Sequence, residues 1–191
     1  PTNFDPSKRY PVVMSQYSGP GSQSVLDKWT IDWEYYLVSK GFIVACVDGR
    51  GTGGRSRAYE TSVYMQLGKL ETEDQVAGAE YMRTLPYVDD KHIGIYGWSY
   101  GGYETLMAMS TSNGTYQAGV AIAPVTDWRY YDTIYAERFM RTPNENNEGY
   151  EQSAPITHAE KLKGDLLIIS GTADDNVHYL NTLQYSAALI E

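Results

Sequence analysis

The chain has 191 residues and a mass of 21.4 kDa, a length that fits one domain with a substantial core. Hydrophobic residues make up 42% of it and charged residues 20%, a balance that excludes an intrinsically disordered chain. The net charge is -9, with 15 basic against 24 acidic residues. Nucleic acid is therefore disfavoured as a partner, because there is no excess of basic side chains to neutralise phosphates.

Apolar runs and helical patterns alternate along the chain, which predicts an α/β fold with a mostly parallel sheet and crossover helices. Residues 11–17 are expected to form a strand, and residues 29–40 a helix that ends at Gly41. Residues 42–47 are expected to form a strand covered on both faces. That strand holds the lone cysteine, Cys46, so no disulfide framework is expected.

The remaining elements continue the alternation after a glycine-rich loop at residues 48–54. We expect helices at 71–84, 100–111 and 179–190, and strands at 92–96, 118–125 and 165–170. Residues 126–158 are irregular and rich in tyrosine, and we expect at least one helix there, around 130–141. Long excursions of this kind are commonly functional. No apolar run approaches the roughly 20 residues that a membrane-spanning helix needs.

The most specific motif is Gly97-Trp98-Ser99-Tyr100-Gly101, a G-x-S-x-G placed directly between a predicted strand and a predicted helix. In so tight a turn the serine backbone is strained, and glycines on either side avoid collisions with the neighbouring strand and helix. The hydroxyl then projects over the carboxyl edge of the sheet, above a helix N-terminus. This context favours a nucleophile over a chance match of five residues.

A serine nucleophile needs a base, and the base needs an orienting carboxylate. In this fold the three groups occur along the chain in the order serine, acid, histidine. Asp174 and Asp175 follow the last predicted strand, where the acid is expected. Asp175 also fits an N-cap at the entry to the last helix. We therefore assign Asp174 to the site.

The histidine base is harder to find. His92 opens a strand at the opposite edge of the sheet, and His158 lies in the irregular excursion. His178 follows Asp174 too closely, because a helix and a strand normally separate these two loops in α/β units. We therefore expect the catalytic histidine beyond Glu191, in a domain truncated before its last strand. The alternative is that His178 serves as the base.

Stabilisation of an oxyanion requires hydrogen-bond donors aimed at the developing negative charge. One expected donor is the backbone N–H of Tyr100, the residue after the nucleophile. A second is the hydroxyl of Tyr17, which lies in the turn after the first predicted strand. Simple packing of the Tyr17 ring is the alternative.

These segments together resemble the hydrolase domain of the prolyl oligopeptidase family of serine peptidases, over nearly the whole chain. The matching segments are residues 16–23, 48–53, 97–103, 123–125, 128–138 and 171–178. The resemblance implies an α/β-hydrolase fold, with residues 1–191 as part of the catalytic domain. It implies Ser99 as nucleophile, Asp174 as acid and Tyr17 as oxyanion donor.

The resemblance also implies an apolar pocket for the residue before the scissile bond, usually proline or alanine. Its implied members are Tyr100, Val125, Trp128, Tyr131, Tyr135 and Val177, and Asn176 matches a side chain that holds a substrate carbonyl. A box of aromatic rings suits a proline ring, which is flat, apolar and without an N–H. Trp128, Tyr131 and Tyr135 recur at intervals that place them on one helical face. Packing of that helix on the sheet is the alternative reading.

The implied activity is the release of N-terminal dipeptides from peptide substrates by acyl-enzyme chemistry, with no cofactor and no metal ligand assigned. The resemblance further implies a β-propeller domain outside this chain, allows a homodimer of the full-length protein, and favours a secreted, periplasmic or cell-surface enzyme. Release of tripeptides or of acylated residues stays open, as does a non-catalytic peptide-binding module. Nucleotide binding at residues 49–54 is disfavoured, because no G-x-G-x-x-G opens a helix there.

Overall fold

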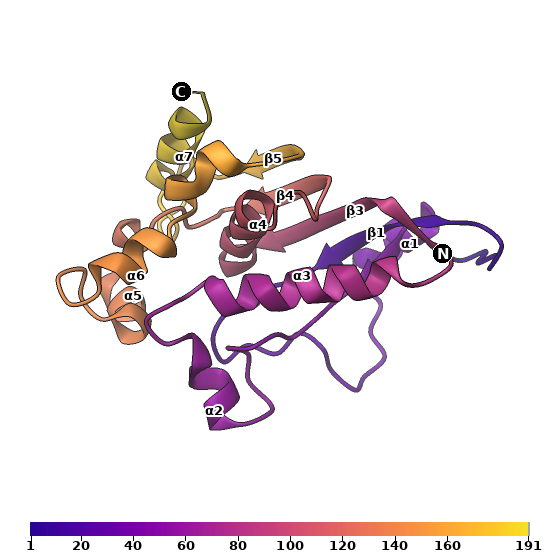
Figure 1. Cartoon of the computed structure of the whole chain (residues 1–191), viewed down its shortest axis with the longest axis horizontal. Helices are drawn as coiled ribbons and strands as arrows, with labels where there is room; N and C mark the ends of the chain where they lie inside the picture. The colour runs from indigo at the N-terminus through magenta and orange to yellow at the C-terminus, as the bar shows by residue number, and fades with distance from the viewer. Residues whose placement is uncertain (191) are drawn as a thin grey trace.

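A computed structural model describes residues 1–190 and contains one five-stranded sheet (Figure 1). The strands are β1 (Tyr10–Ser15), β2 (Ile43–Ala45), β3 (Val88–Trp98), β4 (Ala118–Ile122) and β5 (Asp165–Ile169). They lie in the order β2-β1-β3-β4-β5, and every neighbouring pair is parallel. The predicted α/β architecture is thus confirmed, and the carboxyl ends of the strands share one edge.

Helices cover both faces of this sheet. Figure 1 shows α3 (Lys69–Arg83) and α4 (Tyr100–Thr111) in front of the strands and α1 (Glu34–Ser39) behind them. Helix α4 packs on both β3 and β4, and α7 (Leu180–Ile190) packs on a 3-10 segment, η3 (Pro155–Lys161). No helix of the described part of the chain is both long and apolar enough to cross a lipid bilayer.

Between β4 and β5 the chain makes the expected long excursion over the carboxyl edge of the sheet. It contains η2 (Trp128–Tyr130), α5 (Thr133–Met140), α6 (Asn147–Gln152) and η3. Figure 1 shows α5 and α6 beyond the arrowheads of the central strands. A shorter pair, α2 (Arg57–Glu60) and η1 (Thr61–Val63), follows the loop after β2. The excursion between β4 and β5 therefore covers the carboxyl ends of the strands.

The core has separate parts with different roles. One part lies between the sheet and α3 and α4, and is made of aliphatic residues such as Val12, Met14 and Ile95. Another lies at the carboxyl edge and is rich in aromatic rings, with Tyr100, Tyr103 and Trp128 all buried. The aliphatic part holds the sheet against its helices, while the aromatic part connects α4 to the excursion.

Several predicted boundaries were wrong. The helix expected over 29–40 is only α1, because Asp32 accepts a hydrogen bond from the Trp33 backbone N–H at 2.7 Å and none of the residues in α1 is buried. The strand expected over 118–125 ends at Ile122, since Ala123 adopts a positive φ of 45°. The strand predicted to be covered on both faces is β2, a short and half-buried strand at one end of the sheet order.

Candidate active site

Ser99 forms the whole connection between β3 and α4. The strand ends at Trp98 and the helix begins at Tyr100, so the serine turns the chain alone, with φ 57° and ψ -115°. An L-residue rarely adopts a positive φ, and here it is held by two backbone hydrogen bonds. The Ser99 N–H donates to the Ile122 carbonyl at 2.8 Å, and the Ser99 carbonyl accepts from the Tyr103 N–H at 3.0 Å.

The glycines on either side of Ser99 are required by close approach of the backbone. A Cβ on Gly97 would lie 2.3 Å from the carbonyl carbon of Gly101, and a Cβ on Gly101 would lie 2.5 Å from the carbonyl oxygen of Gln16. These are contacts that real side chains do not make. The turn can therefore bring Ser99 this close to β1 only with glycine at both positions.

Ser99 lines a small cavity of about 30 Å³ whose other walls are mostly aromatic. The other lining residues are Tyr17, Tyr100, Val125, Trp128, Tyr131 and Tyr135. The rings of Trp128 and Tyr135 stack at 5.8 Å between centroids, and those of Tyr131 and Tyr135 meet edge to face at 5.4 Å. Burial raises the pKa of Tyr100 and of Tyr135, so both phenols stay neutral and the wall stays uncharged.

The three rings of the excursion do not share one helical face, contrary to the spacing argument. Trp128 lies in η2, Tyr131 follows it with extended backbone angles, and Tyr135 lies in α5. The physical reason is that two aspartates start separate turns. Asp127 accepts from the backbone N–H of Arg129, and Asp132 accepts from that of Tyr135, both at 2.8 Å. The rings nevertheless line the same cavity.

The loop after β5 carries Asp174 and reaches the aromatic wall. One oxygen of Asp174 accepts the backbone N–H groups of Asn176 and Val177, both at 3.0 Å. The Tyr131 hydroxyl donates to Asn176 Oδ1 at 2.9 Å, and Val177 is buried in the same cluster as Trp128. The structure thus joins this loop to the cavity beside Ser99. Helix α7 begins at Leu180, too late for an N-cap at residue 175.

None of the three histidine rings forms a hydrogen bond with Ser99 or Asp174 within residues 1–190. His92 Nδ1 lies 2.8 Å from Asp89 Oδ2, and His158 Nε2 lies 2.9 Å from the carbonyl oxygen of Gln152. His178 is exposed in the loop after Asp174. Ser99 and the loop that carries Asp174 therefore adjoin the same aromatic cluster, and no histidine among the described residues is hydrogen-bonded to either side chain.

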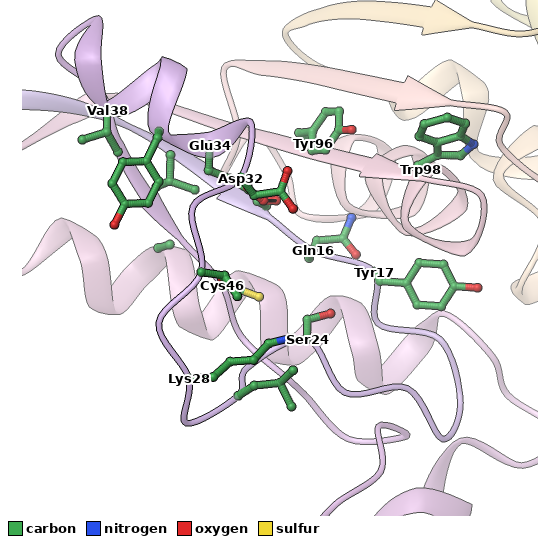
Figure 2. A pocket seen from close by; sticks show the side chains of 16 residues that line it. Gln16, Tyr17, Ser24, Lys28, Asp32, Glu34, Val38, Cys46, Tyr96 and Trp98 are labelled. Carbon is green, nitrogen blue, oxygen red and sulfur yellow. Dashed lines mark hydrogen bonds between the residues drawn. The ribbon is translucent and has the colours of Figure 1, made fainter.

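Tyr17 lines both the small cavity and a larger one beside it. The residue is 40% exposed, and its hydroxyl forms no hydrogen bond among the described residues. The larger cavity has a volume of about 730 Å³ and is also lined by Tyr96 and Trp98. Figure 2 shows Tyr17 and Trp98 at one end of that cavity, with the acidic side chains of Asp32 and Glu34 elsewhere on its lining.

Buried amides and hydroxyls anchor the backbone on both sides of Tyr17. Gln16 Nε2 donates to the Gly101 carbonyl at 2.8 Å, and the Ser18 hydroxyl donates to Gln16 Oε1 at 2.9 Å. Gln75 Nε2 on α3 donates in turn to Ser18 Oγ at 3.0 Å. Sequence analysis missed these positioning contacts. Gln16 and Ser18 flank Tyr17 in the segment 16–23, whereas Gln75 lies in no motif.

Glu71 is a second feature that sequence analysis missed. The helix predicted over 71–84 begins at this residue, where an acidic side chain suits the positive end of the helix dipole. Glu71 is fully buried, and its Oε1 accepts the Tyr100 hydroxyl at 2.7 Å. Burial raises the pKa of this carboxyl to about 7. An acid placed directly behind the cavity wall is not readable from spacing alone.

Two other kinds of site, a metal-ligand cluster and a phosphate site at the glycine-rich loop, can be compared with the described residues. They contain no group of three or more histidine, cysteine or acidic side chains that could hold a metal ion. In the glycine-rich loop, the Arg50 backbone N–H donates to Asp74 of α3 at 2.6 Å. The helix after that loop, α2, has only four residues. This loop therefore lacks the long helix N-terminus on which a bound phosphate would rest.

A strained serine between a parallel strand and a helix, with an acidic loop after a later strand, defines the class of α/β-hydrolases. The model of the prolyl oligopeptidase family, Peptidase_S9, matches residues 29–191. The chain belongs to this family. The predicted family and fold class are thereby confirmed.

Named relatives and solved structures agree with this family. A probable dipeptidyl-aminopeptidase B of Ajellomyces capsulatus (strain H88) is 50% identical over 187 residues, which cover 96% of this chain and 20% of the relative. The crystal structure of Porphyromonas gingivalis dipeptidyl peptidase 4 superposes with a TM-score of 0.98 at 58% identity, covering 100% of this chain and 27% of that one. A putative dipeptidyl aminopeptidase IV from Bacteroides ovatus ATCC 8483 gives a TM-score of 0.97 at 41% identity, with the same coverage. The chain thus spans about a fifth of the length of its curated relatives.

Proposed function

We propose that this chain carries the nucleophile and the acid of a serine exopeptidase that releases dipeptides from the N-terminus of peptides, cleaving after proline or alanine. The observation that carries the proposal is the position of Ser99, which stands on a strained turn and lines the same cavity as Trp128 and Tyr135. Relatives named as dipeptidyl aminopeptidases and dipeptidyl peptidases support the same reaction class.

In the proposed reaction, Ser99 Oγ attacks the carbonyl carbon of the scissile peptide bond while its proton passes to a histidine. The backbone N–H of Tyr100 and the hydroxyl of Tyr17 donate hydrogen bonds to the resulting oxyanion. The intermediate then expels the amine of the shortened peptide, which takes the proton from the histidine. The dipeptide remains as an ester on Ser99 until water, deprotonated by the same histidine, releases it.

The proposed acid is Asp174, which orients the histidine and stabilises its positive charge. We place that histidine outside residues 1–190, because neither His92 nor His158 lies in a cavity with Ser99 and His178 forms no hydrogen bond with Asp174. Replacing His178 by alanine in the full-length protein should leave turnover within about threefold of the parent. A loss of about a thousandfold or more would instead make His178 the base.

The proposed pocket for the residue before the scissile bond is the aromatic cavity. A proline ring leaves no N–H to satisfy, so neutral rings can cover it without a polar penalty. Asn176 would hold a substrate carbonyl with its amide nitrogen, since its oxygen already accepts the Tyr131 hydroxyl.

The proposal is tested in the full-length protein with a fluorophosphonate probe and with chromogenic dipeptide anilides carrying proline, alanine or phenylalanine at the second position. The parent should be labelled and should hydrolyse the proline and alanine substrates. Ser99→Ala should lose labelling and at least about a thousandfold of kcat. Ser112→Ala, a serine at the far end of α4, is the matched control and should behave as the parent.

Other outcomes separate the alternatives. Preference for tripeptide or N-acylated substrates would move the protein to a different exopeptidase class within the same chemistry. Binding of proline-containing peptides with neither labelling nor turnover would replace the proposal by a non-catalytic binding module. Labelling that persists in Ser99→Ala would show that another residue is the nucleophile.

A further inference from the structure

We propose that Glu71 is a positioning residue for the candidate active site. By accepting the hydroxyl of Tyr100, it fixes the ring that forms one wall of the cavity beside Ser99, and so determines which side chain the cavity accepts before the scissile bond. This inference rests on the proposed peptidase function and assigns a role to a residue on α3 that touches no substrate.

Tyr100 is the residue through which Glu71 would act. It follows Ser99 directly, its ring lines the cavity, and only 3% of its surface is exposed. Its ring meets Tyr103 edge to face at 5.1 Å and Trp128 in a tilted contact at 5.5 Å. These contacts restrict lateral movement of the ring. Among the described residues, the hydroxyl at its far end is hydrogen-bonded to Glu71 Oε1 alone, at 2.7 Å. The hydrogen bond thus sets how far the ring projects into the cavity.

The environment of Glu71 makes it an unusual choice for structural packing alone. The residue is fully buried in the first turn of α3, and its second oxygen has no hydrogen-bond partner among the described residues. Burying a carboxyl group is unfavourable, and burial raises the pKa of Glu71 to about 7. Leucine would pack at this position without that penalty. What leucine would not supply is the acceptor for Tyr100.

A neighbouring contact provides an internal comparison. Glu104 of α4 is also fully buried, and its Oε1 accepts the hydroxyl of Thr72 at 2.8 Å. This second carboxyl joins the same two helices, α3 and α4, but does not line the small cavity and does not contact the Tyr100 hydroxyl. Loss of Glu104 should therefore disturb the helix interface without moving the cavity wall.

The experiment uses the full-length protein and dipeptide anilides with proline or leucine at the second position. Glu71→Leu removes the acceptor, Tyr100→Phe removes the donor, and the double variant removes both. Glu71→Gln keeps an acceptor oxygen, and Glu104→Leu is the matched control. For each variant, kcat and KM are measured separately, and the ratio of kcat/KM for proline over leucine is the main readout.

We expect Glu71→Leu and Tyr100→Phe each to lower the proline-over-leucine ratio by about tenfold, mainly by raising KM for the proline substrate, since an unpaired buried hydroxyl or a freed ring loosens the wall. The double variant should lose no more than either single variant, because both remove the same contact. Glu71→Gln should keep the ratio within about twofold. Glu104→Leu should lower thermal stability and leave the ratio unchanged.

Distinct results overturn the inference. An unchanged ratio in both Glu71→Leu and Tyr100→Phe, or fully additive effects in the double variant, would show that Glu71 does not act through Tyr100. If Glu71→Leu fails to fold, Tyr100→Phe, Glu71→Gln and their combination give the same comparison. Absence of hydrolysis by the parent protein would overturn the proposed function itself, and it is distinguishable because every variant would then also be inactive.

Discussion

Glu71 is a carboxyl group without exposed surface, and its environment makes the stability of the chain depend on pH. Burial is the main cause of the raised pKa, from an ordinary value of 4.5 to about 7, and the Tyr100 hydroxyl partly opposes it by hydrogen bonding. The nearby carboxylate of Asp74 raises it further. The folded state therefore keeps a proton on Glu71 at pH values where the unfolded chain has released it.

This linkage gives a prediction with a definite sign. Because the pKa of Glu71 is higher in the folded state, the free energy of unfolding should fall as the pH rises from 4.5 to about 7, by about 3 kcal/mol. Glu71→Gln should remove that part of the slope. Unfolding in urea at a series of pH values measures it.

The exposed Glu160, replaced by glutamine, is the control and should retain the parent slope. A slope that is identical in the parent and in Glu71→Gln would contradict the assignment of the raised pKa to this carboxyl.

At the residue scale, the motif around Ser99 was predictable from the sequence. The buried side chains that position the motif and its neighbours were not. The position of Ser99 follows from the glycines around it, which local sterics demand. Glu71, Gln16 and Gln75 contribute through contacts across 29, 85 and 57 residues of sequence, to Tyr100, Gly101 and Ser18 respectively. Such contacts depend on how the elements pack, and no local pattern encodes them.

At the scale of elements, α5 shows how one capping residue places an aromatic ring. Asp132 precedes the helix with extended backbone angles, and its side chain accepts the backbone N–H of Tyr135. The Tyr135 ring then stacks on Trp128. The direction of the helix, and with it one wall of the cavity, therefore depends on this cap.

Asp132→Ala should destabilise the protein by about 1 kcal/mol, since a helix loses its side-chain N-cap. It should also weaken binding of the proline substrate, because Tyr135 is less firmly held, so KM should rise more than kcat falls. Thermal unfolding and steady-state kinetics of the full-length protein measure the two effects. Asp132→Asn, which can still cap, should stay close to the parent; an equal loss in that variant would point to charge and not to capping.

Element boundaries were the least predictable feature. Trp29 and Trp33 carry helical spacing, yet α1 reaches only as far as Trp33, its N-cap residue, and 82% of the Trp29 surface is exposed. In the excursion, Asp127 and Asp132 break one apparent helical stripe into two turns. Periodicity identifies apolar positions, but a capping side chain decides where the helix begins.

At the scale of the whole molecule, the alternation of strands and helices was sufficient to predict a parallel sheet, because crossover connections leave few topologies. The contacts that hold successive crossovers together were not predictable. Arg50, in the loop after β2, donates from Nε and Nη2 to the two carboxylate oxygens of Asp74 on α3, at 3.0 and 2.7 Å. This paired contact ties the loop to the next helix.

Arg50→Lys should lower the free energy of unfolding by about 1 kcal/mol, because lysine keeps the charge but cannot form the paired geometry in a half-exposed site. Urea unfolding at low and high salt measures the change. The loss should persist at high salt, since geometry and not charge is removed. Equal stability of the parent and Arg50→Lys at both salt concentrations would show that the paired contact between Arg50 and Asp74 does not stabilise the fold.

The side chain of Tyr17 lies between the small cavity, of about 30 Å³, and the larger one, of about 730 Å³. Tyr17→Ala would remove both the ring and its hydroxyl. It would join the two cavities, so that bulky reagents could reach Ser99 from the side of β2. Tyr17→Phe keeps the ring between the two cavities and removes only the hydroxyl. Comparing the two variants would therefore separate the steric role of the Tyr17 ring from the hydrogen bond that its hydroxyl is proposed to donate.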